Sequence, residues 1–279
     1  MTQTRRYSEL DVFTATPLLG NPLAVVHDGR GLSDAQMAAF ARWTNLSETT
    51  FLLPPTHAEA DYHVRIFTPE RELPFAGHPT VGSCHAWLSA GGRPRNVDVV
   101  IQQCGVGLVR VRRDGARLAF AAPPLKRSGS LEPELLARIA GGLGLQADEV
   151  VDHQWVDNGP GWCAVRLKSA ERVLQLKPDY AQLRGLSLGV VAPHPAGSDA
   201  QFEVRALIGH GPGYEDPVTG SLNASLAQWL IGAGVAPAHY VAAQGAALKR
   251  AGRVHVQRVG ADIWIGGDVC EVVAGTVTL

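Results

Sequence analysis

Three short segments of the chain carry side chains that could move a proton or hold an anion. Two are turns in which a titratable residue stands directly before a proline, Gly77-His78-Pro79 and Glu215-Asp216-Pro217. A histidine exchanges protons near neutral pH, and an aspartate in an apolar surrounding can be held protonated. In the third segment, Asn45–Phe51, the carboxylate of Glu48 stands among Ser and Thr residues just before an apolar strand. There it could act as a general base, although composition alone favours an exposed glutamate at a helix end.

Each of the two turns leads into a segment with helical spacing, Thr80–Ala90 in the first case and Thr219–Gly232 in the second. Proline suits a first helical turn because its missing N–H would have no partner there. The free N–H groups of such a helix end, with Gly77, Gly220 and the hydroxyl of Ser221 nearby, suit the binding of a carboxylate. One such turn alone is best explained as an ordinary capped helix. Two together favour a substrate-binding site.

The two turns belong to an internal repeat. At a shift of 138 residues, His78–Ser83 falls on Asp216–Ser221, and the proline, glycine and serine of the two segments coincide. Both segments follow strands and precede a helix, which favours duplication over a chance match. The sequence therefore predicts two α/β domains, 1–124 and 125–279, with the active site between the two turns. The last strand is allowed to pack back on the first domain.

Further local patterns give the elements that would position these residues. Ser33 and Gln36 have the spacing of a capping box and predict a helix over 33–44. Pro123-Pro124 interrupts the strand pattern and predicts a linker over 122–130. Expected strands are Tyr7–Thr14, Leu23–His27, Thr49–Leu53, Tyr62–Phe67, Leu118–Ala121, Val150–Val156, Trp162–Leu167, Ser187–Ala192 and Gln201–Leu207.

Composition limits the class of protein. The 279 residues are 46% hydrophobic and 18% charged, which is enough apolar material for a core and too few charges for a disordered chain. Lys plus Arg total 25 and Asp plus Glu total 26, so neither a nucleic acid nor a membrane surface is expected as a partner. No signal peptide and no membrane span are recognised, and we predict a cytoplasmic protein. Four scattered cysteines without a CxxC pair predict reduced thiols and no metal site.

At its chemically interesting segments the sequence resembles the phenazine-biosynthesis protein F family, which is related to diaminopimelate epimerase. The resemblance implies an α+β fold of the diaminopimelate epimerase type, with two pseudo-repeated domains that each wrap a curved, mostly antiparallel sheet around a central helix. The helices expected after the two turns would be these central helices. The matching segments are Asp11–Thr14, Gly20–Val25, Asn45–Thr49, Arg65–Pro69, Glu72–Thr80, Glu215–Ser221 and Gln244-Gly245.

The resemblance also implies an isomerase that works without metal or cofactor on a small carboxylate. In the phenazine enzyme, the glutamate that matches Glu48 moves a proton between two carbons of a dihydro-hydroxyanthranilate. The residues that match His78, Asp216 and Ser221 assist proton transfer and substrate placement. The resemblance also implies a homodimer. The stretch after Gln244-Gly245 follows the family pattern only loosely, so the resemblance implies no ligand contacts there.

Two other functions stay open at this point. Diaminopimelate epimerase uses one thiol in each half, whereas neither turn here has a cysteine; Asp216 stands about where the second thiol would be, and the first turn offers Gly77-His78. Two-thiol racemisation is therefore disfavoured, but an amino-acid racemase or epimerase with Glu48 and Asp216 or His78 as opposing bases is an alternative. So is a non-catalytic small-molecule-binding protein that kept the fold.

Overall fold

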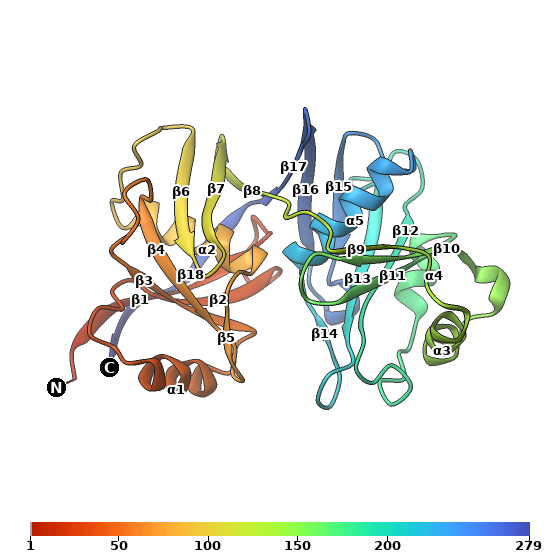
Figure 1. Ribbon diagram of the computed structural model, residues 1–279, viewed down its shortest axis with the longest axis horizontal. Helices are drawn as coiled ribbons and strands as arrows, with labels where there is room; N and C mark the ends of the chain where they lie inside the picture. The colour runs from red at the N-terminus through yellow and green to blue at the C-terminus, as the bar shows by residue number, and fades with distance from the viewer. Residues whose placement is uncertain (1) are drawn as a thin grey trace. The chain divides into compact units, whose positions relative to one another are not determined.

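The computed structural model describes residues 2–279, and the chain divides into two compact units (Figure 1). The first unit extends to Ala121 and also contains Gly266–Leu279, whereas the second is Ala122–Ile265. Each unit is built from a largely antiparallel sheet and one deeply buried helix. Within the described residues, no helix has the length and apolar character needed to span a bilayer.

In the first unit, most neighbouring strands are antiparallel and two pairs of strands are parallel. Strands β18, β1 and β2 are antiparallel neighbours, as are β3 with β4 and β6 with β7, while β2–β3 and β4–β6 are parallel. A helix connects the strands at each parallel step, as parallel pairing requires a crossover. The elements are β1 (Thr4–Val12), β2 (Asn21–Val26), α1 (Asp34–Thr44), β3 (Glu48–Leu53), β4 (Tyr62–Phe67), β5 (Glu72–Leu73), α2 (Gly77–Ser89), β6 (Val99–Cys104), β7 (Gly107–Asp114), β8 (Arg117–Ala121) and β18 (Val269–Thr278).

The second unit has the same kinds of pairing. Antiparallel pairs are β10–β11, β12–β13 and β15–β16, and the parallel pairs are β11–β12 and β13–β15. The elements are β9 (Arg127–Gly129), α3 (Pro133–Leu143), the 3-10 helix η1 (Ala147–Glu149), β10 (Val150–Asp157), β11 (Trp162–Leu167), α4 (Ala170–Gln175), β12 (Ser187–Pro193), β13 (Phe202–Ile208), β14 (Tyr214–Asp216), α5 (Gly220–Gly232), β15 (His239–Gln244), η2 (Ala246–Leu248), β16 (Gly252–Val259) and β17 (Asp262–Gly267).

The element order of the second unit repeats that of the first. The series β10, β11, α4, β12, β13, β14, α5, β15, β16 corresponds to β1, β2, α1, β3, β4, β5, α2, β6, β7. The two parallel steps fall at the same places in both series. The predicted internal repeat is therefore confirmed at the level of topology.

The predicted register of this repeat is wrong, however. Helix α2 begins at Gly77 and α5 at Gly220, and each has 13 residues. The two helices coincide at a shift of 220 − 77 = 143 residues, which aligns Glu72–His78 with Glu215–Ser221. The shift of 138 matched a short Pro-x-x-Gly-Ser string, but Gly82 of that string lies inside α2, whereas Gly220 begins α5.

The start of α2 differs from the prediction because it carries little local signal. The helix begins three residues before Thr80, and Pro79 lies in its first turn, where a missing N–H costs no hydrogen bond. Ala76 precedes it without a side-chain cap. By contrast, the predicted capping box of Ser33 and Gln36 is present at the start of α1 and is confirmed.

Helices α2 and α5 are the central helices of the two units (Figure 1). The eight consecutive residues Gly77–Cys84 are all buried, as are the six residues Leu222–Ala227. A helix with one buried face would bury residues only every three or four positions. Protein therefore surrounds both helices on every side, and small residues such as Gly82 and Ala224 allow the sheet to approach them.

Candidate functional site

The first unit brings two of the predicted catalytic residues into contact. Glu48 is the first residue of β3, and His78 is the second residue of α2. Oε2 of Glu48 lies 3.4 Å from Nε2 of His78, and the two side chains are 15% and 6% exposed. This separation is slightly longer than a direct hydrogen bond, of the kind that tightens when substrate binds. The pair can therefore share or pass a single proton.

The parallel pairing of β2 with β3 explains why these residues meet. Leu23 of β2 lies opposite Glu48 in the ladder, so both strands start at the same edge of the sheet. The first turn of α2 lies at that edge as well, because the His78 imidazole contacts Asn21 and Pro22 from β2 in addition to Glu48. A carboxylate from one strand and an imidazole from the helix are thus placed by the fold rather than by a flexible loop.

Burial keeps the imidazole of His78 neutral. It lowers the pKa of His78 from 6.5 to about 3, and a hydrogen bond with the Pro22 carbonyl, which raises the pKa, only partly offsets this effect. Nδ1 also lies 3.4 Å from the side-chain nitrogen of Asn21. A neutral imidazole has one donor nitrogen and one acceptor nitrogen. At neutral pH His78 therefore meets Glu48 as a neutral hydrogen-bond partner and not as an imidazolium.

The first turn of α2 is suited to an anionic group. In the described part of the chain, no side chain caps Ala76 and no acidic residue stands in the first turn. The helix N-terminus thus keeps its partial positive charge. Gly77 begins the helix and has no side chain to hold a ligand away from the backbone. This places a candidate carboxylate-binding group next to the Glu48–His78 pair.

In the second unit, Asp216 and the start of α5 form one connected turn. Thr219, the residue before α5, donates its hydroxyl to Oδ2 of Asp216. Its backbone N–H donates to Oε1 of Gln244 at 3.1 Å. The hydroxyl of Thr219 therefore holds the Asp216 carboxylate instead of capping the helix, and Gly220 follows as the first helical residue.

Gln244, the last residue of β15, fixes this turn and is 1% exposed. Its Oε1 also accepts from Nδ2 of Asn223 at 2.8 Å, while its Nε2 donates to the Asp216 carbonyl at 3.1 Å and to the Thr219 hydroxyl at 3.0 Å. With these bonds both ends of the amide are engaged and its orientation is set. Nothing in the sequence around Gln244 predicts this role, because a buried amide between two distant turns leaves no local signal.

Ser221, the second residue of α5, is held by two residues that sequence reasoning missed. The indole N–H of Trp162 donates to Oγ of Ser221 at 3.1 Å, and Nδ2 of Asn158 donates to the Ser221 carbonyl at 2.9 Å. Because an indole can only donate, the hydroxyl of Ser221 still has its own proton to offer. Trp162 and Asn158 lie far from Ser221 in sequence, and only the pairing of β10 and β11 beside α5 brings them there.

The corrected repeat changes which residues correspond. His78 and Ser221 now hold the same position, as the second residue of each central helix. The counterpart of Asp216 is Leu73, so the expectation that Asp216 corresponds to His78 is wrong. Glu48 begins β3, and the residue that begins the equivalent β12 is Ser187. The two units therefore offer different chemistry at equivalent places.

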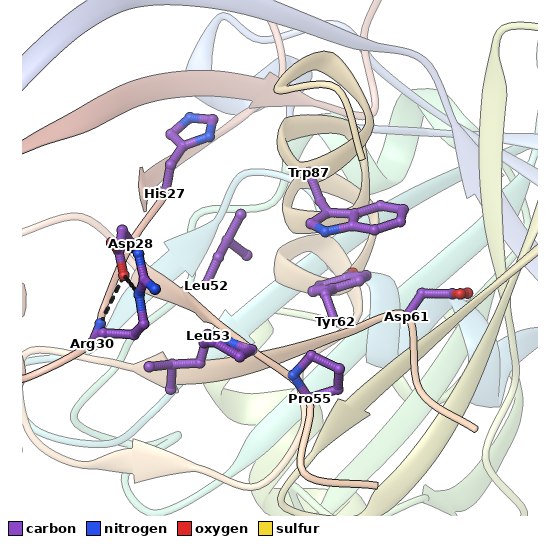
Figure 2. A pocket seen from close by; sticks show the side chains of 10 residues that line it. His27, Asp28, Arg30, Leu52, Leu53, Pro55, Asp61, Tyr62 and Trp87 are labelled. Atoms are coloured by element: carbon purple, nitrogen blue, oxygen red, sulfur yellow. Dashed lines mark hydrogen bonds and ion pairs between the residues drawn. The ribbon is translucent and has the colours of Figure 1, made fainter. Parts of the chain in front are cut away.

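A separate cavity of about 260 Å³ lies in the first unit (Figure 2). Figure 2 shows the rings of Tyr62 and Trp87 on one side of it and the Asp28–Arg30 pair on the other. None of the predicted site residues lines this cavity. In residues 2–279, no group of three or more His, Cys, Asp or Glu side chains could hold a metal ion. Cys84 is fully buried, and burial raises the pKa of its thiol to about 12.

Comparison with known proteins places the chain in a family. A family model described as phenazine biosynthesis-like protein matches residues 10–268. Antisense-enhancing sequence 1 of Schizosaccharomyces pombe is 38% identical over 229 residues, which are 77% of this chain and 76% of that protein. Trans-2,3-dihydro-3-hydroxyanthranilate isomerase of Pseudomonas fluorescens is 33% identical over 225 residues, 79% of this chain and 78% of that enzyme. A crystal structure of a PhzF-family protein of Enterococcus faecalis has a TM-score of 0.83 at 24% identity and covers 99% of this chain and 100% of that one.

These likenesses confirm the predicted α+β fold of the diaminopimelate epimerase type. Several similar proteins are named isomerases, which confirms the prediction of an isomerase. With its match over residues 10–268, the chain belongs to the phenazine biosynthesis-like protein family.

Proposed function

We propose that this isomerase moves a proton between two carbons of a small carboxylate without the help of a cofactor. The observation that carries the proposal is the buried contact of Glu48 with His78 beside the first turn of α2. A carboxyl group next to a neutral imidazole can remove a proton from one carbon and return it to another. Atoms and electrons balance within the substrate, because the proton removed is the proton returned.

The other candidate residues are assigned to binding and to support of the transfer. Removal of a proton beside a conjugated carboxylate leaves negative charge on the substrate, which hydrogen-bond donors and helix N-termini stabilise. We assign this role to the backbone at Gly77 and Gly220 and to the hydroxyl of Ser221. His78, as a neutral imidazole, supports the transfer as a hydrogen-bond partner of Glu48, and Asp216 assists as a second donor or acceptor.

The substrate class follows from one relative and one unsatisfied atom. Trans-2,3-dihydro-3-hydroxyanthranilate, on which the Pseudomonas fluorescens relative acts, is an amino acid with a conjugated ring. Oδ1 of Asn158 is buried without a hydrogen-bond partner in the described residues, and Nδ2 of the same side chain binds the carbonyl of Ser221. Buried acceptors of this kind call for a donor. An amino group on the substrate would supply it, so we propose a carboxylate that also carries an amino group.

The test is turnover of trans-2,3-dihydro-3-hydroxyanthranilate in D₂O, followed by proton NMR. Glu48→Gln keeps the shape of the side chain but removes its basicity, and should lower kcat by at least ~10². The exposed Glu70 provides the control, since Glu70→Gln should leave kcat unchanged. Full activity of the Glu48 variant on any substrate that the protein turns over would sink the assignment. Deuterium at the α-carbon of an amino acid, with the enantiomer formed and no double bond moved, would instead indicate a racemase.

A further inference from the structure

A buried arginine fixes the strand that carries Asp216 by an ion pair. Arg205 of β13 donates from Nε and Nη2 to the two carboxylate oxygens of Glu215 in β14, at 3.0 and 2.6 Å. Both side chains are only 5% exposed. Nη1 of the same guanidinium donates to the carbonyls of Val173 and Leu176, at 3.2 and 2.8 Å. One side chain therefore connects β13, β14 and the end of α4.

The first unit has an equivalent arginine–glutamate ion pair at the equivalent place. Arg65 of β4 binds both carboxylate oxygens of Glu72 in β5 at 2.7 and 2.6 Å, and its Nη1 reaches Asp34 of α1 at 2.6 Å. The helices α1 and α4 are equivalent, and Glu72 coincides with Glu215 in the corrected repeat. Here, however, the arginine side chain is 20% exposed and the glutamate 41%. The device occurs in both units but is sealed from water only in the second.

A second contact fixes the same segment two residues later. A Cβ atom on Gly245 would lie 2.7 Å from the carbonyl oxygen of Pro217, and a Cβ atom on Gly105 would lie 2.7 Å from Cα of Pro74. Each glycine directly follows the strand after the central helix, β15 or β6. The backbone of the proline in each unit therefore packs closely against a glycine. The residue between the glutamate and the proline is thus fixed on both sides, by the ion pair of the glutamate and by this contact of the proline. In the second unit that residue is Asp216.

The buried pair is better suited to positioning than to stabilising. The loss of hydration on burial offsets much of the attraction between two charges, so a buried ion pair is a weak source of stability. Its bidentate geometry, by contrast, fixes both the place and the orientation of the carboxylate. Asp216 has a short side chain, and the carboxylate can move far only if the backbone at Glu215 moves.

We propose that Arg205 is a positioning residue that, through Glu215, sets the Asp216 carboxylate and the first turn of α5. The inference rests on the proposed function only for the part that Asp216 plays in turnover. The placement of Asp216 itself can be measured independently of any substrate.

The first experiment is hydrogen–deuterium exchange on the full chain with the variant Arg205→Lys, which keeps the charge but loses the two-pronged geometry. Amide exchange in peptides covering 209–219 should become about tenfold faster or more, with exchange in α3 unchanged. The matched control is Arg65→Lys, which should affect 72–78 and leave 209–219 as in the wild type. Unchanged exchange in 209–219 for Arg205→Lys, or an even increase over the whole second unit, would overturn the proposal. If that variant does not fold, Glu215→Gln serves the same purpose.

The second experiment separates positioning from a purely structural role. With trans-2,3-dihydro-3-hydroxyanthranilate as the probe, Arg205→Lys should lower kcat by about tenfold or more and change KM less than twofold. The exposed Arg42 gives the control, because Arg42→Lys should leave both values unchanged. A variant with faster local exchange but wild-type kcat would overturn the link from Arg205 to catalysis. A wild type without turnover would count against the proposed substrate, while the exchange data would still decide whether Arg205 positions this segment.

Discussion

His78 and Ser221 occupy the same position in the two units, yet one is an imidazole kept neutral by burial and the other a hydroxyl held by an indole. The helix starts that carry them are alike: both begin at a glycine and lack a side-chain cap in the described residues. The duplication thus preserved the means of binding an anion, which depends on the backbone. The side chains that can move a proton diverged.

The divergence extends to the residues around the two helix starts. Glu48 contacts His78 in the first unit, whereas the equivalent strand of the second unit begins with Ser187. In turn, the second unit has Asp216 where the first has Leu73. Each unit therefore has a carboxyl group beside the start of its central helix, but the two groups come from different elements.

Acid stability should depend on His78. Its folded-state pKa of about 3 lies below the unfolded value of 6.5, so the unfolded chain takes up a proton first as the pH falls. The stabilisation is complete above pH 6.5 and is lost as the pH falls from there toward 3. Between pH 7 and 5, the wild type should lose about 2 kcal/mol more of its unfolding free energy than His78→Gln. Urea denaturation at the two pH values measures this difference.

The control for this experiment is His210→Gln, since His210 is exposed. It should follow the wild type at both pH values. An equal loss of stability for the wild type and His78→Gln would show that His78 takes up its proton in the folded state at an ordinary pH.

Because α2 is closely packed, replacing Gly82 by a larger residue should lower the stability of the fold. A Cβ atom there would lie 2.5 Å from Cδ2 of Leu23 and 2.9 Å from Cγ2 of Val12. Gly82→Ala should therefore destabilise the fold by about 1–3 kcal/mol, although alanine favours a helix by about 1 kcal/mol over glycine. Gly232, at the end of α5, has open space around it. Gly232→Ala should be neutral or stabilising, and thermal unfolding of both variants tests the contrast.

The parts of this fold that could be predicted are those with signals in their own residues. The capping box of Ser33 and Gln36 sets the start of α1 by hydrogen bonds between neighbours. The start of α2 at Gly77 has no such signal, because contacts with β2 and β3 determine it. Helix α4, with six residues, and β14, with three, are too short to show a periodic pattern, so neither element is predicted from the sequence.

The arrangement of the candidate site, like that of the fold, could be predicted only where local sequence signals exist. Glu48 and His78 stand 30 positions apart (78 − 48), and nothing in either segment alone indicates that they touch; the family resemblance supplies that link. Gln244 reaches Asp216 only because β15 pairs with β13 in parallel. Arg205 is buried in the middle of strand β13. Charged side chains are seldom buried unless they are paired, and the sequence of the strand does not indicate the partner. Residues that act through long-range pairing leave no trace in local spacing.

The amide nitrogen of Gln244 should be essential to the turn at Asp216. Gln244→Glu keeps the shape and the acceptor oxygen but replaces the donor to the Asp216 carbonyl by an oxygen, and adds a buried negative charge. The variant should lose at least ~2 kcal/mol of unfolding free energy. Gln175 is exposed, so Gln175→Glu should change it by less than about 0.5 kcal/mol. Equal stability of both variants in urea would contradict the central place of Gln244.

The hydroxyl of Ser221 should act in substrate binding, and Trp162 should act through it. A hydrogen bond to a charged carboxylate contributes about 1.5–3 kcal/mol, so Ser221→Ala should raise KM about tenfold or more. Trp162→Phe removes only the donor that holds Oγ of Ser221 and should raise KM less, by about two- to threefold. Steady-state kinetics with trans-2,3-dihydro-3-hydroxyanthranilate gives both values.

Ser225, one turn later in α5, is the matched control for these variants. Its hydroxyl donates to the carbonyls of Ser221 and Leu222 within the helix, and the side chain is fully buried. Ser225→Ala therefore removes the same atom from the same helix without removing a donor to a ligand, and KM should stay at the wild-type value. If Ser221→Ala and Ser225→Ala give the same KM, the hydroxyl of Ser221 contributes nothing to binding of the carboxylate, and the assignment of Ser221 is wrong.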